Sequence, residues 1–420
     1  MPPKPHYHYS FKMRLLISLS AWLIAWTAPA ADWPQWRGPT RDGQVVGLAW
    51  PDSLKPDRLK QVWRTELGAS YSGPLSDAER VYTTESRDQT HEAVLAFDRA
   101  TGRQLWRVQW EGYQKVPFFA RGNGDWIRAT PALADGRLFV GGMRDVLVCL
   151  DAATGREAWR VDFPGQFQKP PPEFGFVSSP LVASNAVFVQ AGAGFVKVEA
   201  ATGKVLWTAL ADDGGMWGSA FSSPVLATLG GTPQLVVQTR SDLAGVAADT
   251  GRVLWHQPIK AFRGMNILTP TVTGPDTLFT SAYGGETKGW RAARDGDAWQ
   301  LAEAWTLKLE GYMTSPVLVD GHAYLHLRNQ RVACVDVAAG RLKWESDEKF
   351  GKYWSLVANG RRLLALDERG ELLLLAANPE KFELVDRRKV TEADTWAHLG
   401  VSGPDLLVRE REGLAVWRWQ

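Results

Sequence analysis

The chain contains only two cysteines in 420 residues, and they are not adjacent. Cys149 and Cys334 occupy matching positions in two copies of an internal repeat, each two residues before an acidic turn residue. These two copies belong to the second and sixth of eight repeats, which would lie on opposite sides of a closed ring of repeats. Because a disulfide needs Cα atoms within about 7 Å of each other, we expect two free, buried thiols.

The usual motifs of metal and phosphate sites are also missing. His322 and His326 are four residues apart, but on a strand this spacing separates them by about 13 Å, too far for two ligands of one ion. The glycine-rich segment 191–194 lacks the strand-to-helix context of a phosphate loop. We therefore predict no metal site. Five loop carboxylates have oxygens of the kind that bind Ca²⁺, but they form no defined ligand set. They are Asp125, Asp212, Asp213, Asp347 and Asp394.

Neither sign of charge dominates, because the formal net charge is +2. Removal of residues 1–30 would take away three cations and no acid, which leaves 390 residues with a net charge of −1. A protein that binds nucleic acid needs a basic surface. We therefore expect no nucleic-acid partner.

Long apolar runs are absent except for residues 15–26. This run follows Lys4, Lys12 and Arg14 and precedes the small residues 28–30, which is the pattern of a secretory signal peptide. It is shorter than the roughly 20 residues of a membrane span. We predict a cleaved signal at residues 1–30, with Met1 or Met13 as the start, and a periplasmic or secreted chain. No cysteine follows the run, so we also expect that the chain is not a lipoprotein.

The chain is rich in one repeat, in which a tryptophan follows a turn glycine by four residues. An acid stands four residues before the glycine in most copies, where it can accept main-chain N–H bonds while glycine supplies a positive φ. Self-similarity of this kind predicts a repeat architecture. The repeat residues are Asp98, Gly102 and Trp106; Asp151, Gly155 and Trp159; Gly203 and Trp207; Gly251 and Trp255; Asp336, Gly340 and Trp344.

Another hairpin precedes each copy and begins in five cases with Ser-Pro or Thr-Pro. Proline is tolerated at the first residue of a strand, and four short antiparallel strands per repeat are typical of a propeller blade. At about 49 residues per blade, one ring uses the whole chain after the signal. We predict an all-β, eight-bladed propeller over residues 31–420. Its innermost strands begin near Pro74, Pro131, Pro180, Pro224, Pro270, Pro316, Ser355 and His398.

The last repeat lacks room for a fourth strand. Residues 61–67 have the pattern of an outer strand but no blade of their own, and an arm at residues 31–60 precedes them. We predict that this strand closes the ring by pairing with the C-terminal strand, with Trp63 near Val416. Such a closure removes free sheet edges.

The repeat of acid, Thr-Gly and tryptophan resembles the tryptophan-docking motif of pyrroloquinoline-quinone (PQQ) propellers. Segments 33–39 and 372–380 look like the start and a late blade of exported PQQ-like repeat proteins. The resemblance implies an eight-bladed ring with tryptophan between adjacent blades. That family includes quinoprotein dehydrogenases and the propeller lipoprotein that helps assemble outer-membrane β-barrels.

The chain departs from both branches of this family. The dehydrogenases carry adjacent cysteines beside the quinone and a Ca²⁺ ion, whereas the two cysteines here are far apart in sequence. The assembly lipoprotein has a lipidated cysteine after its signal, which this sequence lacks. The resemblance therefore predicts fold more strongly than activity.

The loops that join an outer strand to the next inner strand gather on one face of the predicted ring. They are rich in aromatic and a few polar residues, the composition of a ligand pocket or of a protein hot spot. The candidate binding residues on this loop face are Trp126, Arg128, Phe176, Trp217, Phe221, Arg263, Asn266, Tyr312, Tyr353, Trp354, Trp396 and His398.

We expect an exported, monomeric, non-catalytic propeller without a cofactor, which binds a protein or a cell-envelope component through this face. One alternative is a PQQ- and Ca²⁺-dependent dehydrogenase of alcohols or sugars. Another is a carbohydrate-binding propeller, since aromatic rings also stack on sugars.

Overall fold

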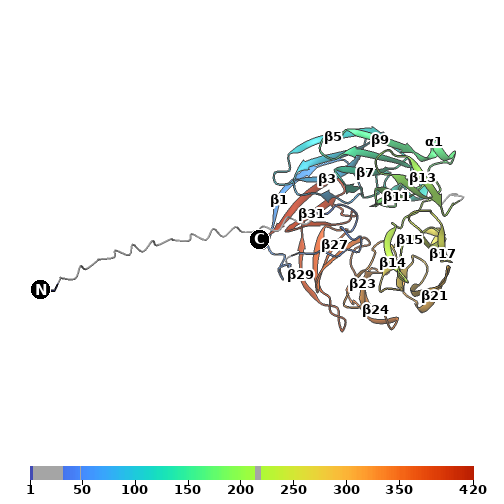
Figure 1. Cartoon of the computed structure of the whole chain (residues 1–420). Coiled ribbons are helices and arrows are strands. Elements are labelled where there is room, and N and C mark those ends of the chain that lie inside the picture. Colours follow the sequence, from blue (N-terminus) through green and yellow to red (C-terminus); the bar gives the residue numbers. More distant parts are fainter. Residues whose placement is uncertain (3–31, 48, 213–218) are drawn as a thin grey trace.

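The computed structural model describes every residue except 3–31, 48 and 213–218, so the predicted signal peptide and Trp217 lie outside the described residues. Eight four-stranded antiparallel sheets are arranged in a ring (Figure 1). The described residues contain one short α-helix and two short 3-10 helices. The predicted all-β, eight-bladed propeller is confirmed.

Each blade is a meander from the axis outward. Blade 1 holds β2 (Leu75–Ser76), β3 (Arg80–Arg87), β4 (His91–Asp98) and β5 (Gln104–Glu111); blade 2 holds β6 (Ala132–Ala134), β7 (Arg137–Gly142), β8 (Val146–Asp151) and β9 (Glu157–Asp162); blade 3 holds β10 (Leu181–Ala183), β11 (Ala186–Ala191), β12 (Gly194–Glu199) and β13 (Val205–Ala209); blade 4 holds β14 (Val225–Leu229), β15 (Thr232–Gln238), β16 (Asp242–Val246) and β17 (Val253–Pro258).

The second half of the ring repeats this order. Blade 5 holds β18 (Thr271–Val272), β19 (Thr277–Ser281), β20 (Thr287–Asp295) and β21 (Ala298–Leu307); blade 6 holds β22 (Val317–Val319), β23 (His322–His326), β24 (Val332–Asp336) and β25 (Arg341–Glu345); blade 7 holds β26 (Trp354–Asn359), β27 (Arg362–Asp367), β28 (Glu371–Ala376) and β29 (Leu384–Lys389); blade 8 holds β30 (Gly400–Ser402), β31 (Asp405–Glu410), β32 (Gly413–Trp419) and β1 (Leu59–Glu66). The short helices are η1 (Phe118–Asn123), α1 (Phe163–Phe167) and η2 (Phe262–Gly264).

The hydrophobic core lies between adjacent blades. The two middle strands of a blade are buried almost throughout, as in β7 and β8, because neighbouring blades cover both of their faces, whereas outer strands such as β13 alternate between exposed and half-buried residues. Cys149 and Cys334 lie in the third strands of blades 2 and 6, where each pairs with a repeat tryptophan, and both are buried and free.

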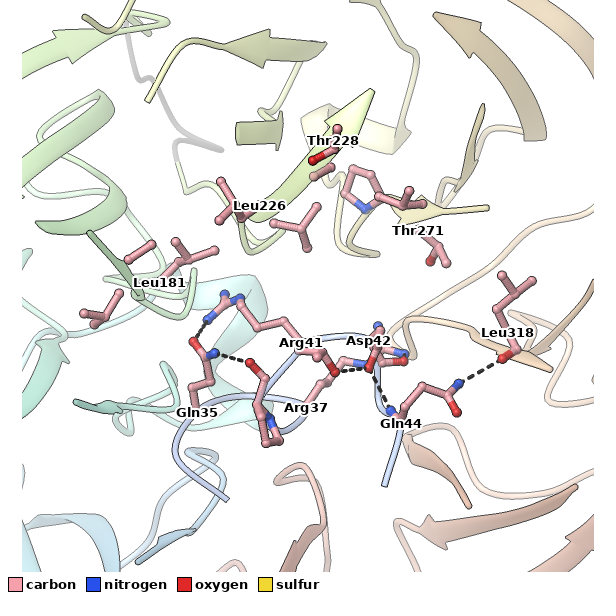
Figure 2. Close-up of a pocket in the computed structure, with 18 residues that line it drawn as sticks. Gln35, Arg37, Arg41, Asp42, Gln44, Leu181, Leu226, Thr228, Thr271 and Leu318 are labelled. Atoms are coloured by element: carbon pink, nitrogen blue, oxygen red, sulfur yellow. Dashed lines mark hydrogen bonds between the residues drawn. The ribbon is translucent and has the colours of Figure 1, made fainter. Parts of the chain in front are cut away.

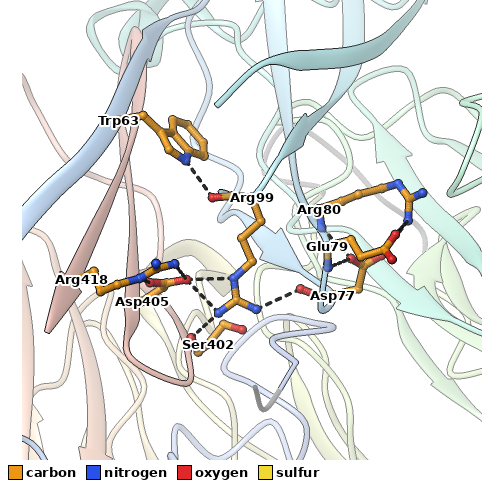
Figure 3. A network of polar contacts seen from close by, with 8 residues as sticks. All are labelled: Trp63, Asp77, Glu79, Arg80, Arg99, Ser402, Asp405 and Arg418. Carbon is orange, nitrogen blue, oxygen red and sulfur yellow. Dashed lines mark hydrogen bonds and ion pairs between the residues drawn. The ribbon is translucent and has the colours of Figure 1, made fainter. Parts of the chain in front are cut away.

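The two ends of the chain close the ring, as predicted. Strand β1 pairs antiparallel with β32, and Trp63 lies opposite Val416. Figure 3 shows the polar contacts at this seam. Arg99 of blade 1 donates to the Asp405 carboxylate of blade 8 at 2.8 Å and to the carbonyl of Ser402 at 2.6 Å, and Asp405 also accepts from Arg418. Trp63 Nε1 donates to the carbonyl of Arg99 at 2.9 Å.

The repeat tryptophans lie against the turn of the next blade. Trp106 Nε1 donates to the carbonyl of Ala152 at 3.1 Å, and its ring covers Gly155, where an added Cβ would come within 2.6 Å of it. Glycine is therefore required twice, for its positive φ of 75° and for this close approach. Matching bonds run from Trp159 to Ala200, Trp207 to Ala248, Trp305 to Val337 and Trp344 to Asn378.

At two seams, no repeat tryptophan donates to the turn of the next blade. Trp255 donates to Gln234 of its own blade at 2.7 Å, because blade 5 has a long β20–β21 hairpin in place of the usual short turn. Between blades 7 and 8, Arg388 lies 4.8 Å from the Trp417 ring and donates to the carbonyls of Leu54 and Leu59.

We expect Trp159→Ala to lower the free energy of unfolding by about 2–4 kcal/mol, because it empties a seam between blades 2 and 3. Leu206→Ala is the control, since Leu206 is 43% exposed on the outer strand β13, and we expect it to cost less than about 1 kcal/mol. Guanidinium unfolding followed by circular dichroism measures both changes. Equal losses would contradict the importance of the seam.

Candidate functional site

The N-terminal arm crosses the central channel of the ring. Trp33 forms a bridge with Ser76 of blade 1, and the carbonyl of Pro34 accepts from the N–H of Leu133 of blade 2 at 2.7 Å. On the other side, residues 43–45 pair in parallel with Ala358 of blade 7. Figure 2 shows the arm at the channel, facing the inner strands of blades 3 to 6.

Two arginines of the arm fix it in the channel. Arg41 donates to the carbonyls of Pro224 at 3.0 Å, Pro180 at 2.7 Å and Ser179 at 3.0 Å, and Arg37 donates to the carbonyl of Pro316. Their side chains are buried, and this desolvation lowers the pKa of Arg41 to about 9 and that of Arg37 to about 10. Both remain charged at neutral pH, so main-chain carbonyls of blades 3, 4 and 6 are satisfied by cations of the arm.

We expect Arg41→Met to lower the free energy of unfolding by about 2–4 kcal/mol, because several buried carbonyls lose their donors. Arg58→Met is the matched control, since the Arg58 side chain is 59% exposed and its ion pair with Asp57 is long, at 3.9 Å. Urea unfolding of the full chain compares the two variants. A loss no larger than that of the control would show that the arm is not held by this guanidinium.

Above the arm, the residue two positions before the innermost strand, or in blade 7 Ser355 within β26, forms the lower tier of a funnel. In most blades it is Ser or Thr, and its hydroxyl oxygen accepts from the main-chain N–H of the preceding blade: Thr130 N to Ser179 Oγ at 3.1 Å, Ser179 N to Ser223 Oγ at 2.9 Å, and Thr269 N to Ser315 Oγ at 2.9 Å. The sequence predicts strand starts at these Ser-Pro and Thr-Pro pairs, and their hydroxyls link blade to blade around the axis.

The upper tier consists of the residue two positions before each lower-tier residue. All eight of these residues line the same cavity, and all but Tyr353 are half-buried beside buried neighbours. Aromatic rings occupy this tier in blades 7, 8, 1 and 4, a cation occupies it in blade 2, and aliphatic side chains occupy it in the rest. In blade order they are Tyr71, Arg128, Val177, Phe221, Ile267, Met313, Tyr353 and Trp396.

Three rings of the upper tier form a continuous aromatic wall. Tyr71 stacks on Trp396 with centroids 4.8 Å apart and an interplanar angle of 9°, and Trp396 contacts Tyr353 at 3.9 Å. The floor is Trp36 of the arm, whose ring lies edge-on to His398 at 6.0 Å. The arm therefore converts the channel into a funnel that is open on the loop face and closed below.

His398 and Arg128 set the polarity of this funnel. Burial, with a contribution from Arg37, lowers the pKa of His398 to about 3, so its ring is neutral. Its Nδ1 lies 2.9 Å from the carbonyl of Leu399, which can only accept, so Nδ1 carries the hydrogen and Nε2 is an acceptor. Burial lowers the pKa of Arg128, whose guanidinium donates to the carbonyl of Gly124 at 2.6 Å and lies 5.3 Å from the Tyr71 ring.

Two buried carboxyl groups connect the loops beside the funnel. Glu92 of blade 1 accepts from Met143 N at 2.8 Å and Trp110 Nε1 at 3.0 Å, and Asp145 of blade 2 accepts from Gly192 N at 2.8 Å. Burial raises the pKa of each carboxyl group to about 7. The charge of Arg160 opposes this rise at Glu92, whereas the charge of Asp162 adds to it at Asp145.

A raised folded-state pKa predicts stability that is present at acidic pH and lost as the pH rises through about 7. We therefore expect Glu92→Gln to reduce the fall in unfolding free energy between pH 5 and pH 8 by on the order of 1–3 kcal/mol. Glu66→Gln, which removes a carboxylate from a side chain that is 89% exposed, is the matched control for the loss of charge. Urea unfolding across this pH range checks the sign.

The structure brings half of the twelve candidate residues into the funnel: Arg128, Phe221, Tyr353, Trp354, Trp396 and His398. Three more lie beside it on the loop face. Trp126 contacts Tyr71 at 5.2 Å, Tyr312 contacts Tyr353 at 6.0 Å, and Arg263 lies 5.0 Å from the Phe262 ring.

Two candidates are not available to a ligand, and Trp217 lies outside the described residues. Phe176 is 1% exposed and packs against Gly141 between blades 2 and 3. Asn266 is also 1% exposed, and its side chain donates to the carbonyls of Thr239 and Arg240, so it holds a loop.

Sequence reasoning missed the floor residue Trp36, the wall residue Tyr71 and the hydroxyl tier. Tyr71 was accessible from the sequence, because it stands three residues before Pro74 as Phe221 stands before Pro224. Trp36 carries no repeat signal, and its role follows only from the path of the arm.

The centre of the ring does not fit PQQ with Ca²⁺. Among the described residues, no Asp or Glu lines the funnel, so none of them offers a carboxylate to a calcium ion there. Elsewhere in the described ranges, no group of three or more His, Cys, Asp and Glu side chains is arranged to hold a metal.

A family model described as "Outer membrane protein assembly factor BamB" matches residues 90–346. The chain belongs to this family. A BamB relative from Yersinia pestis is 19% identical over 76% of this chain and 68% of its own length, and one from Shewanella oneidensis is 25% identical over 60% of this chain and 61% of its own length. The second match therefore spans less than two thirds of that relative.

Solved structures show the same fold. BamB from Moraxella catarrhalis is 16% identical, has a TM-score of 0.62 and covers 86% of this chain and 98% of its own. A europium-containing methanol dehydrogenase is 13% identical, has a TM-score of 0.53 and covers 93% and 98%. The predicted PQQ-like family is confirmed, and membership of an assembly-factor family supports the predictions of no enzymatic activity and no resident cofactor.

One prediction is wrong on these comparisons. We expected that the chain is not a lipoprotein, because no cysteine follows the apolar run of residues 15–26. The relatives are BamB assembly factors, the lipoprotein branch of the family, so the missing cysteine does not separate this chain from that branch. In the described residues, no helix is long and apolar enough to cross a membrane.

Proposed function

We propose that the chain is a periplasmic, non-catalytic scaffold of outer membrane protein assembly that binds a protein partner through its loop face. The observation that carries this proposal is the funnel: all eight blades contribute one wall residue at the same position, and the arm closes the floor. Such a surface offers a central pocket with aromatic anchors, the arrangement found at protein hot spots.

Exposed rings around the funnel support a protein partner. Phe118 in η1 is 79% exposed, Phe119 is 43% exposed, and Phe262 in η2 is 44% exposed. Large exposed rings that cluster around a pocket are typical of an interface that is covered by another protein. The names of the BamB relatives point to partners in outer membrane protein assembly.

We expect Phe118→Ser combined with Phe262→Ser to reduce capture of an envelope protein at least tenfold, because both loop-face anchors lose their apolar area. The matched control combines Leu206→Ser with Leu342→Ser, which are 43% and 38% exposed on outer strands. Cross-linking of the full chain in the producing cells, followed by quantitative mass spectrometry, measures capture. Equal capture by both double variants would contradict binding through the loop face.

A further inference from the structure

We infer that the funnel accepts one tyrosine side chain of the partner protein, an inference that rests on the proposed function. The cavity has a volume of about 230 Å³, below the roughly 300–1,000 Å³ of sites for drug-sized ligands. Because Trp36 closes the floor, a chain cannot thread through the ring. The funnel therefore suits a single side chain inserted from a loop or a chain end.

The upper tier fits an aromatic ring. The Tyr71–Trp396–Tyr353 wall presents ring faces and edges on one side, and Met313 and Phe221 are half-buried on the other. An aromatic pair contributes about 0.5–1.5 kcal/mol beyond the area that it buries. A sugar ring fits less well, because its hydroxyls would face Met313 and the other aliphatic residues of this tier without hydrogen-bond partners.

The lower tier offers hydrogen-bond partners to an oxygen at the tip of the inserted aromatic ring. The oxygens of Ser179, Ser223 and Ser315 each accept a main-chain N–H, and no described residue accepts their hydrogens, which stay available to a ligand. Neutral His398 offers Nε2 as an acceptor in the same cavity. A phenol can donate to Nε2 and accept from a serine hydroxyl, whereas phenylalanine would leave these buried groups without a partner.

The test uses the full chain and three peptides, acetyl-Gly-Xaa-Gly-amide with Xaa as tyrosine, phenylalanine or leucine, titrated by calorimetry. We expect the tyrosine peptide to bind at least tenfold more tightly than the phenylalanine peptide and the leucine peptide to bind most weakly. Equal binding of the tyrosine and phenylalanine peptides would overturn the inference. So would methyl glucoside binding as tightly as the tyrosine peptide, because the ligand would then be a sugar.

Two variants place this binding in the funnel. Met313→Trp fills the cavity and should abolish peptide binding, whereas Leu342→Trp on the outer strand β25 should leave it unchanged. His398→Phe should remove the preference for tyrosine over phenylalanine, with phenylalanine binding retained. Peptide binding that survives Met313→Trp overturns the inference. If Met313→Trp also leaves partner capture in cells intact while the loop-face double variant loses it, the scaffold function stands and the tyrosine socket does not.

Discussion

Each innermost strand of a propeller has one edge that faces the axis and has no neighbouring strand, and its main-chain groups still need partners. Two devices meet this need here. Serine and threonine hydroxyls link one blade to the next, as from Thr130 to Ser179, and Arg41 of the arm supplies donors to the carbonyls of Pro180 and Pro224. The candidate site depends on both, because together they turn an open channel into a funnel with a floor.

The regular part of this fold was readable from the sequence because it repeats. The glycine–tryptophan spacing reports a physical contact, in which the Trp106 ring lies on Gly155 of the next blade, and unpaired strand residues around Trp63 predicted the closure. Trp255 shows the limit of such reasoning. It has the same spacing as its counterparts, yet it bonds to Gln234 of its own blade, because the partner of a seam residue is set by the hairpin of the next blade.

The candidate site was half predictable for a similar reason. Position within the loop decides whether a ring faces the axis: Val177 and Met313, three residues before their prolines, line the funnel, while the neighbouring Phe176 is buried in the core. Aromatic composition points to Phe176, whereas position relative to the proline points to Val177. The floor was not predictable from either, because the arm has no repeat and Trp36 is placed by the contacts of Arg37 and Arg41.

The arm also decides what the centre of this ring can hold. Arg37 and Arg41 are buried cations that donate to main-chain carbonyls, and Arg37 helps to keep His398 neutral above them. The described residues form no carboxylate cage for a divalent ion at the funnel wall, and the hydroxyls and Arg128 of this wall favour electron-rich oxygen over ammonium groups. The same blades that surround a cofactor in a dehydrogenase can therefore surround a side chain here, because the centre is filled by the chain's own N-terminal arm.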